Sequence, residues 1–320
     1  MISTVLTIVG LLVLVALALM IGLQIWSHMV ARKAEIAIPQ IGDIATVKGG
    51  KIHFLDQGQG QPIVMIHGLG GHLQNFTYAT TDALKGDFRV IALDRPGSGY
   101  SQRDSDEQAR IPEQARMIAE MLEARGIEKP LIVGHSLGGA VALALALAYP
   151  NAISGLALIA PLAVLPEEGA KAFDPLKIAN PVVRRLIGET LAVPMSIRKG
   201  DATLRFIFGP NKPPADFRLR GGGLLGLRPR AFVAASTDYV AVGTDMANVT
   251  ARFSELKMPV GVLYGDADRI LDASANLDAL RAAIPQLDEE VLPGIGHMVQ
   301  ISMPDETEAF IRRMAAKSFG

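Results

Sequence analysis

The stretch from Leu131 to Tyr149 constrains the fold of this chain more than any other. An apolar run leads into Gly134-His135-Ser136-Leu137-Gly138, and a helical run follows from Ala140 to Tyr149. This is the strand–turn–helix context in which a G-x-S-x-G motif presents a serine at a sharp, strained turn. The residues two before and two after that serine must be small, and both are glycine.

Ser136 is therefore predicted at the carboxyl end of a central strand and at the N-terminus of a helix. Free N–H groups and the helix dipole favour negative charge at that place. The alternative interpretation is a glycine-rich turn before a buried helix. The flanking pattern favours a nucleophilic serine, and Ser136 is the one residue of this chain in such a motif.

Length and composition set the wider limits. The chain has 320 residues, enough for one large α/β domain with an insertion or for two small domains. Its net charge of −1 gives no global argument for nucleic acid, which we do not expect as a partner. The chain contains no cysteine, which excludes disulfides, thiolate metal ligands and a cysteine nucleophile.

The N-terminal segment is much more apolar than the rest. From Val5 to Trp26 no residue is charged. As a helix this run would be roughly 33 Å long, enough to cross a hydrocarbon core of about 30 Å, with Trp26 at interfacial depth. A cleaved signal peptide would have a positive residue before a shorter run, and a buried core helix is rarely so uniformly apolar. We expect a membrane anchor over residues 1–33 and a linker over 34–42.

Two positive charges follow the apolar run, at Arg32 and Lys33. Under the positive-inside rule they place the remainder of the chain on the cytoplasmic side of a single-pass anchor.

Strands and helices alternate along most of the remaining chain. Such alternation indicates a mostly parallel sheet with helices on both faces. Strands are expected at 44–47, 51–56, 62–66, 88–93, 131–133, 153–159, 260–264 and 290–292, and helices at 74–85, 113–125, 140–149, 274–284 and 304–316. Prolines interrupt the alternation between 162 and 256, which predicts an inserted, mostly helical cap between two core parts, 43–161 and 257–320.

A serine hydroxyl needs a base to remove its proton and a carboxylate to orient that base. Of the six histidines, His297 lies in a glycine-flanked loop after the last expected strand, where a parallel sheet presents it at the same edge as Ser136. We choose His297 as the base. Asp266 and Asp268 both follow the strand at 260–264 and both qualify as the carboxylate; we choose Asp268 and keep Asp266 as its rival.

Other polar residues near these turns are interpreted as structural. His67 is expected to shape the glycine-rich loop that follows it, and Asp94 to cap a Pro/Gly turn. His135 is expected to point away from Ser136. The loop after His67 lacks the Lys-Ser/Thr of a phosphate-binding loop, so we assign it a backbone N–H, that of Leu69, which with the N–H of Leu137 would stabilise a developing oxyanion.

Residues 43–316 resemble a serine hydrolase of the α/β-hydrolase superfamily. The motifs that carry the resemblance occur in family order: His67-Gly68-Leu69-Gly70, Asp94-Arg95-Pro96-Gly97-Ser98-Gly99-Tyr100-Ser101, Gly134-His135-Ser136-Leu137-Gly138-Gly139, Gly265-Asp266-Ala267-Asp268 and Gly296-His297. The resemblance implies the α/β-hydrolase fold and a triad in the chain order Ser136, Asp268, His297. The family's acid is usually the Asp three residues after the glycine, which supports Asp268.

The resemblance is less informative about the substrate, because esterases, lipases, C–C bond hydrolases, haloperoxidases and amidases share these motifs. Serine at position 136 argues against the dehalogenase and epoxide-hydrolase branches, which have Asp there. The N-terminal span together with Gly-His-Ser-Leu-Gly resembles the membrane-anchored monoacylglycerol lipases. We therefore expect hydrolysis of small-molecule or lipid carboxylic esters through an acyl-enzyme, without cofactor or metal.

Two alternatives stay open: other α/β-hydrolase chemistry, such as C–C, amide or haloperoxidase-type reactions, and a non-catalytic membrane-tethered binding protein. The cap adds a further hint. Residues 177–230 contain eleven Lys and Arg against three acidic residues, a balance of +8. The cap is either a solvated helical lid or a lid that binds anionic headgroups and draws lipid into an apolar pocket.

Overall fold

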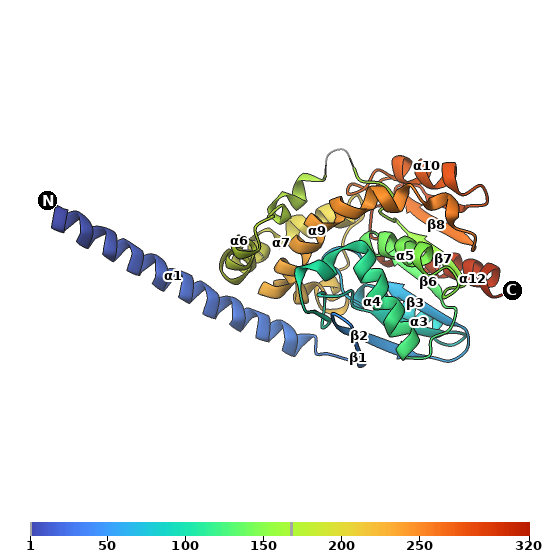
Figure 1. Cartoon of the computed structure of the whole chain (residues 1–320), viewed down its shortest axis with the longest axis horizontal. Coiled ribbons are helices and arrows are strands. Elements are labelled where there is room, and N and C mark those ends of the chain that lie inside the picture. The colour runs from blue at the N-terminus through green and yellow to red at the C-terminus, as the bar shows by residue number, and fades with distance from the viewer. Residues whose placement is uncertain (1, 167–168) are drawn as a thin grey trace.

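The computed structural model describes residues 2–166 and 169–320. Met1 of the expected anchor and Glu167 and Glu168 of the expected cap lie outside the described residues. One long helix projects from a rounded α/β body that holds the rest of the chain (Figure 1).

The described residues form one nine-stranded sheet. Eight of its strands lie in the order β1-β2-β4-β3-β6-β7-β8-β9, and the ninth, β5, pairs with β2. Pairing is antiparallel at β1, β2 and β5 and parallel from β4 through β3 to β9. The strands are β1 (Asp43–Val47), β2 (Gly50–Gln57), β3 (Pro62–Ile66), β4 (Arg89–Leu93), β5 (Gln102–Arg103), β6 (Leu131–His135), β7 (Gly155–Ile159), β8 (Val260–Gly265) and β9 (Asp288–Leu292).

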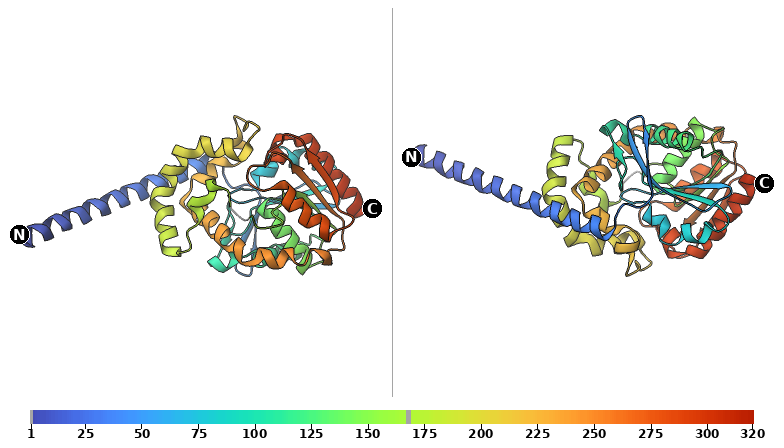
Figure 2. Two further views of the ribbon diagram at one scale, coloured as in Figure 1. Left: turned by 90° about the horizontal axis from the view of Figure 1, so that it is seen from above. Right: turned by 90° about the horizontal axis from the view of Figure 1, so that it is seen from below.

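Helices cover both faces of this sheet, as the continuous apolar runs of its central strands require. Figure 2 shows α4 and α5 on one face and α3 and α12 on the other. The helices are α1 (Ile2–Ala37), α2 (Gln74–Thr77), α3 (Thr80–Leu84), α4 (Ile111–Ala124), α5 (Leu137–Ala148), α6 (Pro181–Ile187), α7 (Val193–Phe208), α8 (Phe217–Arg220), α9 (Pro229–Thr250), α10 (Ala273–Ala283), α11 (Val299–Ser302) and α12 (Pro304–Phe319).

Helix α5, which follows the serine turn, has apolar residues on all of its sides because other parts of the protein pack around it. Residues Leu137–Leu147 of α5 are all buried, and α5 packs against the sheet, α4 and α9. By contrast α4 buries one stripe that includes Met117, Met121 and Leu122. A helix that packs against one layer needs only one apolar face.

The expected single helix over 74–85 is wrong. The chain forms α2 and α3 instead, separated at Tyr78 and Ala79, and Ala79 has φ −147°, outside the helical region. The break lets Thr80 and Thr81 turn inward, where α3 packs on β4 and α12. Tertiary packing therefore outweighs the helical tendency of the local sequence.

The expected linker over 34–42 begins later than the sequence indicates. Helix α1 continues to Ala37, and its last turns pack against the cap segments Gly188–Ala192 and Gly223–Leu227. Small side chains allow this close approach: Ala31 and Ala34 are buried, as is Ile38 just beyond the helix. The first two-thirds of α1 is exposed and, by length and composition, is a candidate membrane span.

In the described residues between β7 and β8 the chain forms only helices and turns. Buried ion pairs tie this cap to the sheet domain. Asp238 on α9 is fully buried and accepts hydrogen bonds from Arg95 at 2.8 Å and from Arg103 at 2.6 Å. Asp245, about two turns further along α9, pairs with Arg110 at 2.6 Å.

We expect Asp238→Ala to destabilise the fold by about 3–5 kcal/mol, because it leaves buried guanidinium charge uncompensated. At roughly 2–4 °C per kcal/mol, the thermal unfolding midpoint of the detergent-solubilised chain should fall by about 10 °C. Asp201→Ala is the control, since the Asp201 side chain is 78% exposed in its pair with Arg218; its effect should stay within about 0.5 kcal/mol. Equal midpoints for the two variants would contradict a cap held by the buried pair.

Candidate active site

Ser136 occupies a strained turn between β6 and α5. Its backbone has φ 55° and ψ −122°, a combination that side chains rarely adopt. The turn is closed by hydrogen bonds to the Ser136 carbonyl from Gly139 N at 2.8 Å and Leu162 N at 3.0 Å. A Cβ at position 138 would collide with the carbonyl oxygen of Ile66, so glycine is required there.

The turn needs a second glycine before the serine. A Cβ at Gly134 would lie 2.7 Å from the carbonyl oxygen of Gly138 and 2.8 Å from the Cα of Gly139. Both glycines of the motif are thus required by close approach of backbone, as the sequence pattern predicts.

His297 and Asp268 form a buried pair at the same edge of the sheet as Ser136. His297 Nδ1 and Asp268 Oδ2 are 2.6 Å apart, and the side chains are 5% and 0% exposed. No hydrogen bond or ion pair joins Asp266 to His297 in the described part of the chain; Asp266 Oδ1 accepts a hydrogen bond from Gly294 N at 2.6 Å and so holds the loop that leads to His297. The two candidate carboxylates therefore have different surroundings.

The Asp268 carboxylate is kept ionised by its partners. Burial raises its pKa, but His297 and the N–H groups of Ile270 and Leu271 together hold that pKa below its ordinary value. Oδ1 accepts both backbone bonds and Oδ2 faces Nδ1 of His297. Nδ1 can therefore carry the proton, which leaves Nε2 as the free basic nitrogen.

Leu69 lies on the loop after β3, and Leu137 is the first residue of α5, directly after Ser136. Neither backbone N–H donates a hydrogen bond within the described part of the chain, and both residues line the same cavity as Ser136 and His297. No hydrogen bond joins the Ser136 hydroxyl to His297 among the described residues; such bonds are often long in unliganded enzymes.

His67 shapes the loop of Leu69, as expected. Its Nε2 accepts from Arg95 N at 3.0 Å, so Nδ1 carries the proton and donates to the Gly68 carbonyl at 2.8 Å. Burial lowers the pKa of His67 and keeps the ring neutral. Asp94 is structural too: its oxygens accept from Leu73 N and Tyr100 N, both at 2.8 Å.

The sequence predicts that His135 points away from Ser136, but it does not predict the contact of the His135 ring with His297. The His135 ring packs against that of His297 with centroids 4.8 Å apart, and its Nε2 lies 3.1 Å from the His297 carbonyl. Burial, then the neighbouring His297, lowers the pKa of His135 to about 3. A neutral His135 therefore forms one side of the site.

The cap contributes Asn211, which sequence reasoning also missed. Its Oδ1 accepts from Gly296 N at 2.8 Å, one residue before His297. A Cβ on Gly296 would collide with the carbonyl of Gly209 and approach that of Phe208 to 2.7 Å. The cap segment thus packs directly on the histidine loop. No motif marks Asn211, so only the folded chain reveals this contact.

Ser136 and His297 line a mainly apolar cavity of about 450 Å³, within the range of small-molecule sites. Its apolar wall comes mostly from the cap and from the loop after β8: Leu162, Phe173, Leu204, Ile207, Val242 and Ile270. Among the residues that the structure describes, no group of three His, Cys, Asp or Glu side chains is placed to hold a metal ion.

Comparison with known proteins agrees with this architecture. Residues 61–304 match the family model described as alpha/beta hydrolase fold. The chain belongs to the α/β-hydrolase family.

Relatives of this α/β hydrolase act on different substrates. The chain is 30% identical over 290 residues to the 2-hydroxymuconate semialdehyde hydrolase of Pseudomonas putida, a match that covers 88% of this chain and 96% of the relative. It is 25% identical over 282 residues to lipase 1 of Psychrobacter immobilis, with 84% and 81% covered.

A solved structure of a membrane phospholipase A, described as a bacterial virulence factor, is similar over nearly the full length. The TM-score is 0.69 with 23% identity, and 98% of this chain and 99% of that chain are covered. At this identity the likeness shows a shared fold alone.

The buried histidines of the site should make this hydrolase sensitive to acid. Burial lowers the pKa of His72, next to the Leu69 loop, to about 4, whereas an unfolded chain protonates near 6.5. Between these two pKa values the unfolded chain binds a proton at His72 that the folded chain does not. The contribution of neutral His72 to the free energy of unfolding is therefore complete above pH 6.5 and is lost as the pH falls towards 4. For His72 alone the loss at pH 5 is about 2 kcal/mol.

We expect His72→Gln to flatten the decline of the thermal midpoint between pH 7 and pH 5, each protein being compared with its own value at pH 7. Parallel curves for the wild type and the variant would contradict a neutral buried His72.

Proposed function

We propose that this α/β hydrolase is a membrane-anchored serine hydrolase that cleaves lipid-like carboxylic esters of the monoacylglycerol or simple ester type. One observation carries the proposal: Ser136, on its strained turn, lines the same mainly apolar cavity as His297, whose Nδ1 is held by the buried Asp268 carboxylate. A positioned nucleophile, base and carboxylate around an apolar cavity suit acyl transfer from an apolar ester.

In the proposed reaction the Ser136 hydroxyl attacks the ester carbonyl while His297 Nε2 takes its proton. Asp268 keeps Nδ1 protonated and stabilises the imidazolium, and the N–H groups of Leu69 and Leu137 stabilise the tetrahedral oxyanion. The alcohol leaves with the proton from His297. Water, deprotonated by the same nitrogen, then attacks the acyl-enzyme and releases the carboxylic acid, which regenerates Ser136.

The size of the cavity supports a substrate with a single acyl chain. A volume of about 450 Å³ lies in the lower part of the range of about 300–1,000 Å³ of small-molecule sites. This size favours an ester with one acyl chain over a substrate with two long chains. Relatives that include a lipase are consistent with an ester substrate.

The anchor and its orientation complete the proposal. Residues 2–26 of α1 are exposed almost throughout and apolar, and Arg32 and Lys33 follow them on the helix. We infer that α1 spans the membrane with the catalytic body on the cytoplasmic side. The cap's positive charge contributes less to the attraction of anionic headgroups than the number of its basic residues suggests, because four of its arginines are ion-paired: Arg184, Arg218, Arg220 and Arg228.

A second candidate is hydrolysis of a different bond at the same site. It is favoured by the relative of highest identity reported above, which by its name hydrolyses 2-hydroxymuconate semialdehyde. Product analysis distinguishes the two, since an ester yields an alcohol and an acid.

The main test is hydrolysis of an ester series from acetyl to long-chain monoacylglycerol by detergent-purified full-length protein. We expect the rate to rise from acetyl to esters of medium chain length and to fall at least about 10³-fold in Ser136→Ala. Cleavage of no ester by the wild type would move the proposal to the second candidate, and full activity in the variant would exclude Ser136 as the nucleophile.

The carboxylate assignment has its own matched pair of variants. Asp268→Asn should lower kcat by about 10³–10⁴-fold, because the amide stabilises the wrong tautomer of His297. Asp266→Asn changes the same group two residues away, where the carboxylate contacts Gly294 N and not the imidazole, so its kcat should stay within about tenfold of the wild type. The reverse order of effects would assign the role to Asp266.

A further inference from the structure

One helical segment of the cap exposes apolar side chains that a water-facing helix would bury. Residues 181–208 run as α6, a π-helical turn at Gly188–Ala192, and α7. One side packs on the cap through Arg184, Thr190 and Val193. Six large apolar residues of the same segment are between 43% and 71% exposed: Val182, Val183, Leu186, Leu191, Met195 and Ile197. We call these six residues the apolar face.

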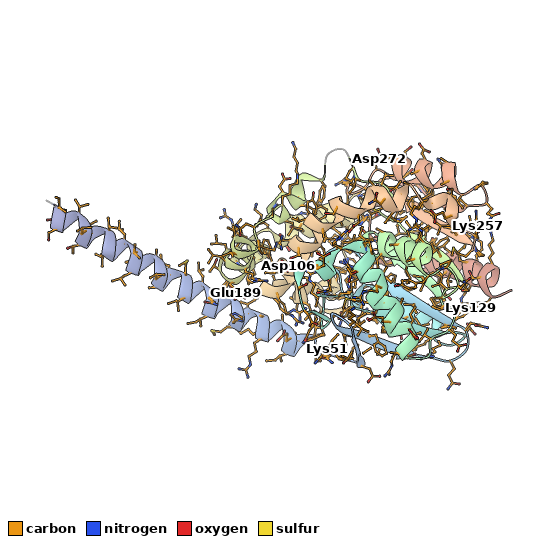
Figure 3. The ribbon with its side chains drawn as sticks, in the orientation of Figure 1. Lys51, Asp106, Lys129, Glu189, Lys257 and Asp272 are labelled. Carbon is orange, nitrogen blue, oxygen red and sulfur yellow. The ribbon has the colours of Figure 1, made fainter. Side chains whose placement is uncertain are left out.

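The apolar face lies beside the anchor. His28 Nε2 of α1 is 2.7 Å from Glu189 Oε2, and α1 packs against Gly188–Ala192. Figure 3 shows Glu189 next to α1. Figure 2 shows the yellow-green helices of this segment at the end of the body from which α1 projects. The contact therefore fixes how deep the apolar face lies relative to the anchor.

That depth coincides with the end of the apolar run. His28 is two residues after Trp26, or about 3 Å further along the helix axis. An aromatic residue at the end of a membrane span marks the interface between hydrocarbon and headgroups. Because Glu189 is tied to His28, the part of the segment around Glu189 lies at this same level, with Leu186 and Leu191 before and after Glu189 in the sequence.

We propose that the apolar face lies in the boundary layer between headgroups and acyl chains of the bilayer that α1 spans. The inference rests on the membrane anchor of the proposed function and adds a second, monotopic contact with the same leaflet. Exposed cations at Arg185, Arg198 and Lys199 border the face and match anionic headgroups, as in interfacial helices.

This contact connects the bilayer to the reaction site through one helix. Leu204 and Ile207, on the last turns of α7, line the cavity of Ser136. Phe208 ends the helix, and Asn211 beyond it holds the loop of His297. Helix α7 therefore runs from the apolar face to the cavity wall, with the mostly exposed residues 198–203 between them.

The chain has a single tryptophan, Trp26, which makes fluorescence a direct test. Full-length Trp26→Phe/Leu191→Trp and Trp26→Phe/Leu186→Trp would be reconstituted in phosphatidylcholine–phosphatidylglycerol vesicles, with and without lipids brominated along the acyl chain. The matched control is Trp26→Phe/Val291→Trp, since Val291 is 39% exposed on β9, at the sheet edge opposite β1. Wild-type Trp26 is the positive reference.

We expect tryptophan at 191 and at 186 to be quenched by brominated lipid to within about twofold of Trp26, and tryptophan at 291 not to be quenched. Tryptophan at 186 and 191 that is unquenched by lipid but accessible to aqueous acrylamide would overturn the proposal. Tryptophan emission at 186 and 191 that shifts to the blue only as the protein-to-lipid ratio rises, without quenching by brominated lipid, would also overturn the proposal. That result would indicate that a second copy of this chain covers the apolar face.

Activity provides a second, independent measurement. Leu186→Asp/Leu191→Asp should lower hydrolysis of monoacylglycerol embedded in vesicles at least about tenfold, since two apolar side chains lose their burial. Hydrolysis of a water-soluble short-chain ester should stay within about twofold, because neither residue lines the cavity. An equal loss on both substrates would contradict a membrane role. Failure of the proposed function would instead abolish ester cleavage in the wild type and leave the quenching result unchanged.

Discussion

The buried guanidinium of Arg95 is the interaction on which the arrangement of this hydrolase depends. It donates to the carbonyls of His67 and Gly68 at 2.9 and 3.1 Å and to Asp238 Oδ2 at 2.8 Å, and it is fully buried. A buried charge is stable only with such compensation. One side chain therefore joins the loop proposed to stabilise the oxyanion to the cap helix that covers the cavity, and neither can move without exposing unpaired charge.

Helix α1 belongs to the same assembly. Glu35 at the end of α1 pairs with Arg228 of the cap, and the Tyr100 hydroxyl donates to the Ile38 carbonyl at 2.6 Å. Tyr100 N in turn donates to Asp94, which also holds Leu73 N on the loop of Leu69. Helix α1, the cap and the site are thus linked by these contacts, so α1 has a fixed orientation relative to the cavity.

Most of the sheet could be predicted because its physics is local. The strand at Pro62–Ile66 is a continuous apolar run, the strand at Leu131–His135 begins with one, and the serine turn needs small residues at fixed offsets. The break between α2 and α3 and the continuation of α1 past residue 34 could not be predicted. Both depend on partners distant in sequence, α12 in one case and the cap in the other.

The sequence by itself determined the strained turn of Ser136, the candidate base His297 and an apolar N-terminal helix, because turn chemistry and hydrophobic periodicity act over a few residues. Only the tertiary structure decided that Asp268 and not Asp266 contacts His297, that the ring of His135 packs beside it, and that cap residue Asn211 holds its loop. These contacts join residues up to 162 positions apart, and their geometry exists only once the core and the cap are packed together.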